Sequence, residues 1–330
     1  MNFSPGMAET ISVAMCSFNG ERFLLEQLES IARQTRLPDE LVVCDDCSSD
    51  STVTILNQFA RRACFPVRIF RNEENLGSTG NFERAIGLCR GNLIALCDQD
   101  DVWNGNKLMR LSGVLEKDGS VGGVFSDADL IDDKGTPIGK RLGEIHAFPF
   151  SKSSTFDRSA AIRLLLKHDI VTGATLMFRA SAREAIGSIP APWIHDGWIA
   201  WMLVLYSRLM FVAEPLVSYR VHSGQQLGVG RIGRRWFFTG YEDRAHLRAM
   251  ARQFETLQER WCSRPGESFE ECRELFDAKR EFLRQRRELP DGAVHRMWAL
   301  ARRALSYERF GRGLRTMRED LFLKGSAGAE

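Results

Sequence analysis

No stretch of this 330-residue sequence is long and apolar enough to cross a bilayer as a helix. Such a helix needs about 20 mainly apolar residues, and the longest candidate, residues 199–212, is interrupted by Ser207 and Arg208. Residues 1–10 also lack the apolar segment of a secretory signal. We therefore expect a cytoplasmic protein without a transmembrane helix.

The sequence also lacks the two common glycine-rich phosphate-binding motifs and a zinc-finger motif. Residues 17–20, which follow the first predicted strand, contain one glycine and do not match the G-x-G-x-x-G pattern, and the chain has no P-loop sequence. Cys44 and Cys47 form a C-x-x-C pair without a second pair at zinc-finger spacing. The eight cysteines are scattered, several in apolar segments, which indicates reduced thiols that pack as small apolar side chains.

The composition is typical of a soluble protein, with 44% hydrophobic and 27% charged residues, but the charge is unevenly distributed. Residues 231–330 contain 22 Lys and Arg against 16 Asp and Glu, whereas residues 1–230 contain 23 against 27. From residue 232 to 322 apolar residues recur at helical spacing. We therefore predict a catalytic domain at residues 1–230 and a basic helical region at residues 231–330.

Short apolar segments alternate with helical patterns in the first hundred residues. Four buried strands are expected at residues 11–16, 40–44, 67–70 and 93–97, with a helix between each pair. This alternation is typical of an α/β fold with a doubly wound, mostly parallel sheet, in which ligands bind at the carboxyl ends of the strands. A polar cluster follows each strand, at residues 17–20, 45–46, 75–81 and 98–101, and we expect the last of these strands to carry the centre of the site.

The second half of the predicted domain contains three further segments of interest. Residues 121–129 and 171–178 are each expected to form a strand, and a tight turn is expected at residues 131–135. A helix is expected to begin at His195 and Asp196, after two prolines. Residues 219–226 are polar and are expected to form a loop after a strand.

Three carboxylates directly follow the fourth predicted strand. Asp98 and Asp100 are two residues apart, so both can converge on one point just beyond the strand end, with Asp101 beside them. Carboxylate oxygens suit Mg²⁺ or Mn²⁺, ions that often also hold substrate phosphates. The alternative is a polar loop in which an aspartate caps the next helix.

The order of these motifs resembles glycosyltransferase family 2. Ser-Phe-Asn-Gly follows strand one, Cys-Asp-Asp-Cys-Ser-Ser-Asp follows strand two, Asn-Leu-Gly precedes a helix and Asp-Gln-Asp-Asp follows strand four. The resemblance implies a GT-A fold and a nucleotide-activated sugar donor. It assigns Asp45 and Asp46 to the nucleoside, against a helix-capping alternative, and Asp98 and Asp100 to the metal ion. The predicted nucleotide-sugar-binding residues are Ser17, Asn19, Asp45, Asp46, Asn75, Gly77, Asp98 and Arg220.

Later segments resemble the bacterial rhamnosyltransferase-like branch of that family. They are residues 172–174, 195–198 and 214–222. The resemblance makes Asp196 the general base, although a carboxylate at a helix start is also a common cap. It also implies that Arg220 neutralises phosphate and that His222 is a further metal ligand, against the alternative of a surface histidine.

The C-terminal region leaves two interpretations open. Residues 278–318 contain 12 Lys and Arg against 4 Asp and Glu, mixed with aromatic residues. Such helices can lie on an anionic membrane surface, or they can form the solvated face of a helical bundle. No nucleic-acid-binding motif accompanies the charge, so we expect no nucleic-acid partner.

The resemblance to glycosyltransferase family 2 implies an inverting, non-processive glycosyltransferase that depends on Mg²⁺ or Mn²⁺. The Gln-x-x-Arg-Trp element of processive members is missing. The resemblance implies a donor such as dTDP-rhamnose and a glycan or lipid-linked glycan acceptor in bacterial surface polysaccharide synthesis, with peripheral contact at the inner membrane face as one of the two interpretations of the basic helices. The alternatives are a sugar-nucleotide nucleotidyltransferase, which needs a glycine-rich basic loop after strand one, and a non-catalytic glycan-binding protein.

Overall fold

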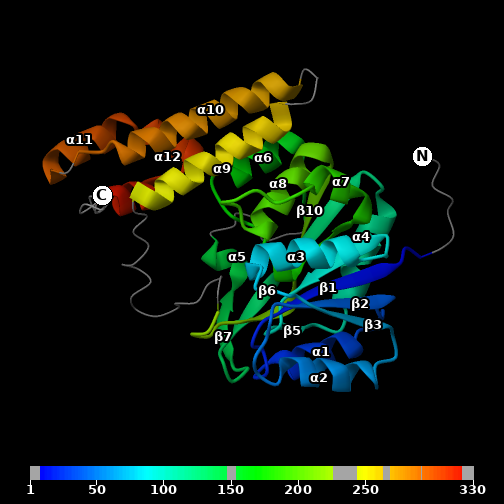
Figure 1. Ribbon diagram of the computed structural model, residues 1–330. Helices are drawn as coiled ribbons and strands as arrows, with labels where there is room; N and C mark the ends of the chain where they lie inside the picture. Colours follow the sequence, from blue (N-terminus) through cyan, green and yellow to red (C-terminus); the bar gives the residue numbers. More distant parts are fainter. Residues whose placement is uncertain (1–7, 147–153, 226–243, 263–267, 291, 322–330) are drawn as a thin grey trace. The chain divides into compact units, whose positions relative to one another are not determined.

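The computed structural model describes residues 8–146, 154–225, 244–262, 268–290 and 292–321. Its contacts divide the chain into two compact units. The first consists of residues 1–162, 169–189 and 194–230, and the second of residues 163–168, 190–193 and 231–330. Each unit is described by itself, and Figure 1 labels the elements of both.

The first four strands form the parallel half of the sheet, as predicted. They are β1 (Ile11–Ser17), β2 (Glu40–Asp45), β3 (Val67–Arg71) and β4 (Leu93–Cys97), in the spatial order β3-β2-β1-β4. Every residue of β1, β2 and β4 is buried, which explains why these strands are mainly apolar. In Figure 1 the helices α1 (Leu24–Ala32) and α2 (Thr52–Ala60) lie on one side of these strands and α3 (Gly77–Leu88) on the other.

The second half of the sheet is mixed. β9 (Leu176–Arg179) runs antiparallel to β4 and to β6 (Val121–Ile131), while β10 (Arg208–Arg220) runs parallel to β6. The strand order continues β4-β9-β6-β10-β5. The remaining elements are β5 (Val102–Trp103), β7 (Pro137–Arg141), β8 (Ser154–Thr155), α4 (Lys107–Lys117), α5 (Leu142–Ile145), α6 (Arg158–Leu165), α7 (Arg183–Ile186), α8 (His195–Tyr206) and the short helical turns η1 (Gly173–Thr175) and η2 (Ala180–Ala182).

Three element boundaries differ from the sequence prediction. α3 begins at Gly77, not after residue 81, because the Asp46 carboxylate accepts hydrogen bonds from the first free backbone N–H groups of that helix. Residues 173–175 form a helical turn before β9, so the strand expected at 171–178 is shorter. The loop expected from residue 219 begins later, since β10 extends to Arg220.

The apolar stretch at residues 199–212 consists of a buried helix followed by a strand. α8 ends at Tyr206 and β10 begins at Arg208, so the two polar residues in the stretch lie at the turn between them. Residues 198–205 are each at most 2% exposed. Within the described part of the chain, no helix is long and apolar enough to cross a membrane.

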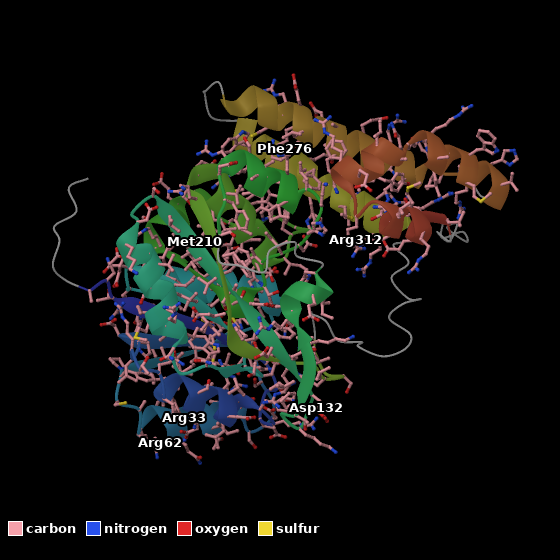
Figure 2. The ribbon with its side chains drawn as sticks, turned by 180° about the vertical axis from the view of Figure 1, so that it is seen from behind. Arg33, Arg62, Asp132, Met210, Phe276 and Arg312 are labelled. Atoms are coloured by element: carbon pink, nitrogen blue, oxygen red, sulfur yellow. The ribbon has the colours of Figure 1, made fainter. Side chains whose placement is uncertain are left out.

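The second unit contains the helices of the C-terminal region. These are α9 (Arg244–Cys262), α10 (Ser268–Arg287), α11 (Ala293–Arg302), α12 (Ala304–Phe310) and α13 (Leu314–Leu321). Phe276, labelled in Figure 2, belongs to their buried apolar core. The fully buried Asp320 accepts two hydrogen bonds of 2.7 Å from Arg286 and one of 2.5 Å from the Tyr307 hydroxyl. This network fixes α13 against α10 and α12.

Glu40 connects three segments at the amino ends of the parallel strands. Its carboxylate accepts hydrogen bonds from Ser12 Oγ at 2.6 Å, the Arg90 backbone N–H at 2.6 Å and an Arg68 guanidinium nitrogen at 2.9 Å. Burial raises the pKa of Glu40, but the three hydrogen bonds lower it by more than that. The pKa is therefore below the ordinary value of 4.5. The ionised form therefore stabilises the fold.

Glu40→Gln is expected to lower the free energy of unfolding at pH 7 by about 1–3 kcal/mol, because it weakens charge-assisted hydrogen bonds in a buried setting. The folded-state pKa is depressed, so the stabilisation is present above pH 4.5 and is lost as the pH falls through the folded-state value. Urea unfolding of both proteins from pH 7 to acid should therefore give converging curves. Glu29→Gln, which removes a half-exposed pair with Arg62, is the control and should cost under about 1 kcal/mol. A difference that widens in acid would contradict this account.

Candidate active site

The acidic loop after β4 is held in place by its one amide side chain. Gln99 accepts a hydrogen bond of 2.8 Å from the Phe18 backbone N–H and donates one of 3.0 Å to the Phe18 carbonyl. The Gly20 position leaves room for this contact, since a Cβ there would lie 2.2 Å from the Gln99 side-chain oxygen. The loop after β1 and the loop after β4 are therefore fixed to each other, as expected for strand ends that share one edge.

Asp100 and His222 lie next to each other; both are predicted metal ligands, and that role stays a prediction. His222 Nε2 lies 2.9 Å from Asp100 Oδ2. His222 Nδ1 accepts a hydrogen bond from the Gly224 backbone N–H, so in the neutral ring Nε2 carries the hydrogen and donates it to Asp100. The imidazole also packs on the Phe23 ring, with centroids 4.8 Å apart, which fixes its orientation.

The Arg220 guanidinium forms hydrogen bonds within the protein. Its side chain is 1% exposed, and its guanidinium donates to the Asp100 and Asp132 carbonyls and to the Glu26 carboxylate. Its backbone N–H donates to Asp101 Oδ1. In this structure Arg220 therefore supports the acidic loop, and its predicted contact with phosphate would require these bonds to rearrange.

Asp196 is held at the start of α8 by two backbone groups. One carboxylate oxygen accepts a hydrogen bond of 2.7 Å from the Gly197 N–H and the other accepts one of 3.2 Å from the Gly173 N–H. The helix terminus also favours a negative charge at this position. The two hydrogen bonds hold the carboxylate in a fixed orientation, which a general base requires.

His195 packs behind Asp196. Its ring stacks on Phe82 with centroids 4.0 Å apart, and among the described residues neither ring nitrogen has a hydrogen-bond partner. Burial lowers the pKa of His195, although the neighbouring Asp196 opposes the shift, so the ring is neutral at pH 7. A Cβ at Gly173 would lie 2.8 Å from His195 Nε2, so the close backbone approach expected at residues 172–174 accommodates this imidazole.

The carboxylates after β4 and the Asp196 carboxylate at the start of α8 influence one another electrostatically. Burial, followed by the negative charges of Asp100 and Asp196, raises the pKa of Asp98 to about 7. Asp101 is buried as well, and its pKa is raised by burial and by the charges of Asp100 and Asp98. One oxygen of Asp101 has no hydrogen-bond partner among the described residues. The negative charges of Asp100 and Asp196 therefore both act on Asp98.

Lys107 is a buried cation in this acidic region that sequence reasoning missed. Its side chain is 0% exposed and lies with Nζ 3.4 Å from the centroid of the Trp103 ring. Nζ donates a hydrogen bond of 2.5 Å to the Ala174 carbonyl, in the same turn as the Gly173 N–H that binds Asp196. Burial lowers the pKa of Lys107 to about 7, against the opposing charges of Cys97, Asp101 and Asp98. A lysine that follows the acidic motif at the start of a predicted helix was the available signal.

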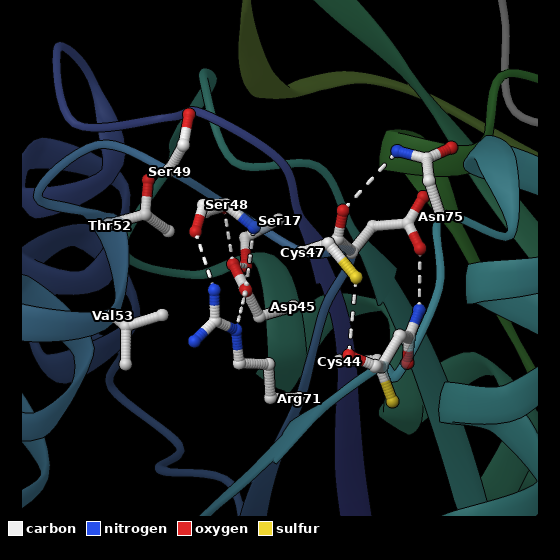
Figure 3. Close-up of polar contacts among 12 residues, drawn as sticks. Ser17, Cys44, Asp45, Cys47, Ser48, Ser49, Thr52, Val53, Arg71 and Asn75 are labelled. Atoms are coloured by element: carbon white, nitrogen blue, oxygen red, sulfur yellow. Dashed lines mark hydrogen bonds and ion pairs between the residues drawn. The ribbon is translucent and has the colours of Figure 1, made fainter.

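Asp45 holds the loop that begins after β2 (Figure 3). Its fully buried carboxylate accepts hydrogen bonds from Ser17 Oγ at 3.0 Å and from both the backbone N–H and the hydroxyl of Ser48. Arg71 Nε lies 3.9 Å away. Asp45 thus has no exposed surface with which to contact a nucleoside in this structure, and its predicted role in nucleotide binding stays a prediction.

Asn19, in the loop after β1, is bonded to the loop after β2. It is exposed and has a left-handed backbone with φ 47°, a conformation that asparagine tolerates. Its backbone N–H donates to Ser48 Oγ and its side-chain oxygen accepts from the Ser49 N–H. The β1 and β2 loops therefore form one connected rim, on which Asn19 is accessible.

Asp46 caps α3, whereas the capping alternative in the sequence was a turn into the helix that directly follows β2. It is 3% exposed and accepts hydrogen bonds from the N–H groups of Leu76 and Gly77 at 2.8 and 2.9 Å. Asn75 donates to the Asp46 carbonyl, and Gly77 has φ 70°, a backbone conformation that favours glycine. The predicted residues Asp46, Asn75 and Gly77 are therefore brought together, as parts of one helix start.

The chemistry of the acidic cluster fits a divalent cation. Two carboxylates and an imidazole are suitable ligands for Mn²⁺, and a positive ion would relieve the repulsion that raises the pKa of Asp98. Within the described ranges, no group of three or more His, Cys, Asp or Glu is already arranged as a metal site. The predicted set of Asp98, Asp100 and His222 thus has one contact formed, between Asp100 and His222.

Comparison with protein families settles the relationship of the chain. Residues 12–186, which include β1 to β4 and the acidic loop, match the model of Glycosyl transferase family 2. The chain belongs to this family. The resemblance on which the sequence interpretation rested is thereby confirmed, whereas its rhamnosyltransferase-like branch stays a prediction.

Curated relatives match parts of the chain. A glycosyltransferase of Nostoc sp. is 27% identical over 222 residues, which are 64% of this chain and 65% of that protein. The putative teichuronic acid biosynthesis glycosyltransferase TuaG of Bacillus subtilis is 30% identical over 64% of this chain and 79% of its own length. The Escherichia coli UDP-Glc:alpha-D-GlcNAc-diphosphoundecaprenol beta-1,3-glucosyltransferase WfgD is 31% identical over 37% and 47%. The match spans less than two thirds of the Nostoc protein.

Solved structures of other proteins share the fold. S. aureus TarS 1–349 in complex with UDP-GlcNAc has a TM-score of 0.62 and 15% identity, over 90% of this chain and 81% of that one. The mannosyltransferase PcManGT from Pyrobaculum calidifontis, in complex with GDP-Man and Mn²⁺, has a TM-score of 0.53 and 14% identity, over 91% and 76%. The α/β fold of the GT-A type with a helical C-terminal region is therefore confirmed.

Proposed function

We propose that this protein is an inverting, metal-dependent glycosyltransferase that transfers one sugar from a nucleoside-diphosphate donor to a glycan hydroxyl. The observation that carries the proposal is that Asp196, held by the Gly173 N–H in the turn that also binds Lys107, acts through its charge on Asp98, about one hundred residues away in the sequence. A base beside an acidic cluster is the arrangement that sugar transfer from a diphosphate donor needs. Membership of Glycosyl transferase family 2 supports the same reaction class.

In the proposed reaction Asp196 acts on the acceptor. One of its carboxylate oxygens takes the proton of an acceptor hydroxyl while the hydroxyl oxygen forms a bond to C1 of the donor sugar. The bond between C1 and the phosphate oxygen breaks at the same time, and the nucleoside diphosphate leaves with that electron pair. A single displacement inverts the anomeric centre and needs no covalent enzyme intermediate. The Gly173 and Gly197 N–H groups keep the Asp196 carboxylate oriented during this step.

Asp98, Asp100 and His222 would hold the divalent cation. A bound Mg²⁺ or Mn²⁺ supplies neutralisation of the charge that develops on the leaving diphosphate. His222 Nε2 must lose its hydrogen to become a ligand, so metal binding and the Asp100 hydrogen bond are alternatives for that nitrogen. A neighbour of similar fold was solved with Mn²⁺, which supports the choice of ion.

The donor and acceptor are proposed as chemical classes. The rim made by the loops after β1 and β2, with Asn19 accessible on it, is our candidate for the nucleoside. The resemblance to the rhamnosyltransferase-like branch favours dTDP-rhamnose. TuaG is named for teichuronic acid synthesis and WfgD for transfer to GlcNAc-diphosphoundecaprenol, which supports a bacterial surface glycan, lipid-linked in some cases, as the acceptor.

A thermal-shift screen tests the site and identifies the donor. Wild-type protein and Asp100→Ala are melted with UDP-, dTDP-, GDP- and CDP-sugars, each with and without Mn²⁺. One sugar nucleotide is expected to stabilise the wild type only with metal, by about 2.7 kcal/mol at a hundredfold excess over Kd, and Asp100→Ala should abolish the effect. Asp118→Ala removes an exposed carboxylate at the opposite ends of the strands and should respond like the wild type. If no donor shifts the wild type, the non-catalytic binder is favoured over the enzyme.

A further inference from the structure

The second unit exposes an unusual number of large apolar side chains on its last three helices. Exposed fractions are 63% for Val294, 54% for Met297, 67% for Trp298, 86% for Leu305 and 79% for Leu314. By contrast, the exposed large apolar side chains in the rest of the described chain are at most 47% exposed. Exposed apolar groups of this size that gather in one region mark an interaction surface.

On α11 the apolar face is the outer one. Val294, Met297 and Trp298 are spaced by three and four residues, so they share one face of the helix. The opposite face is buried, and there Arg296 donates to the carbonyls of Pro290 and Leu321. The buried face thus carries Arg296 and the apolar Leu300, while three further large apolar residues face outward and are not covered by the packing of this helix.

Unpaired positive charge accompanies these apolar residues. Arg302, Arg309 and Arg318, one on each of α11, α12 and α13, are exposed, and none of them forms an ion pair with another described residue. Two of the three acidic residues on these helices are paired with other arginines. Asp320 is buried against Arg286, and Glu319 pairs with Arg312 (labelled in Figure 2). Only Glu308 is left to balance the exposed arginines among the described residues of these helices. The surface therefore combines apolar side chains with net positive charge.

We propose that this surface, made by Val294, Met297, Trp298, Leu305, Leu314 and the three arginines, binds an anionic phospholipid bilayer. Tryptophan is favoured at the boundary between headgroups and acyl chains, and leucine, valine and methionine gain by insertion into it. Exposed arginines next to them are attracted to the negative lipid surface. A second copy of this chain would meet the same unpaired arginines, and the like charges would oppose that contact. The inference does not rest on the proposed sugar transfer.

Vesicle flotation of the full chain tests the proposal. The protein is expected to float with vesicles of phosphatidylcholine mixed with phosphatidylglycerol and not with phosphatidylcholine alone, and added salt should reduce the bound fraction. Trp298→Ser with Leu305→Ser is expected to lower the partition coefficient about tenfold or more, because two large apolar groups leave the membrane. Arg302→Gln with Arg309→Gln should lower it about thirtyfold, since each arginine near the lipid surface contributes roughly 1 kcal/mol.

Two further variants distinguish lipid binding by this surface from general stickiness of exposed apolar groups and from self-association. Leu25→Ser with Met109→Ser removes two exposed apolar side chains of the first unit, 47% and 44% exposed, and should float like the wild type. Trp298→Leu keeps an apolar side chain, so it should still float but should lose the blue shift of tryptophan emission that vesicles induce in the wild type. No flotation of the wild type, or unchanged flotation of the Trp298/Leu305 variant, overturns the proposal. It is also overturned if light scattering shows a dimer that this variant converts to a monomer, because the surface is then a contact between copies.

Discussion

Asp196→Asn is expected to reduce kcat by about 10²–10⁴-fold, because the acceptor hydroxyl loses the carboxylate that takes its proton. Donor binding should change little, since the hydrogen bonds that hold Asp196 come from the backbone of Gly173 and Gly197 and the side chain keeps its size. The measurement is release of nucleoside diphosphate from the donor identified in the melting screen, with donor Kd measured by titration.

The control for this prediction is another aspartate at a helix start. Asp157 accepts a hydrogen bond of 2.7 Å from the Ala160 N–H at the beginning of α6, outside the acidic cluster. If Asp196 were merely a cap, Asp157→Asn and Asp196→Asn would both lose up to about 1 kcal/mol of stability and keep their activity. Equal kcat values for the two variants would therefore remove Asp196 from the mechanism.

Lys107→Met is expected to lower the free energy of unfolding by about 1–3 kcal/mol, since Asp98 and Asp101 lose a neighbouring cation that burial leaves only partly protonated at pH 7. The side chain is fully buried, and Asp98 and Asp101 are the carboxylates whose charges act on it. The Ala174 carbonyl also loses its hydrogen-bond donor, so the turn that binds Asp196 is less well fixed. We therefore expect kcat to fall together with stability.

Urea unfolding and Mn²⁺ titration together test this role of Lys107. Mn²⁺ should restore more stability to Lys107→Met than it adds to the wild type, because an added cation partly replaces the lost positive charge beside the carboxylates. Lys117→Met removes an exposed lysine from the last turn of the same helix and should change stability by less than about 1 kcal/mol. Equal unfolding curves for the two variants would show that Lys107 compensates no charge in this site.

The parallel half of the fold could be predicted because its signals are local. Each of the strands β1, β2 and β4 is a short apolar stretch that ends in a polar cluster, and the period of the helices between them is readable from the sequence. The antiparallel β9 was harder to place, since strand order depends on contacts between distant segments. Residues 173–175, which we expected in this strand, form a helical turn that brings the Gly173 N–H to Asp196.

In the candidate site, too, the sequence indicated residues but not their contacts. The sequence indicated that Asp100, His222 and Asp196 carry chemistry, and the structure joins Asp100 to His222 and lets the charge of Asp196 act on Asp98. It did not reveal that Asp46 would cap α3, because the partner N–H groups lie 30 residues further along the chain. Lys107 was missed because a lysine in a helical pattern is ordinarily on the surface.

The sequence by itself determined the family, the alternation of strands and helices, and which acids follow the strands. These properties depend on residue type and on spacing along the chain. The tertiary structure alone decided the environment of each charged group: that Arg220 and Lys107 are buried, that Asp45 is enclosed by serines, and that the outer face of α11 is apolar. The physical reason is that burial and hydrogen-bond partners are set by segments far apart in the sequence, which only the folded chain brings together.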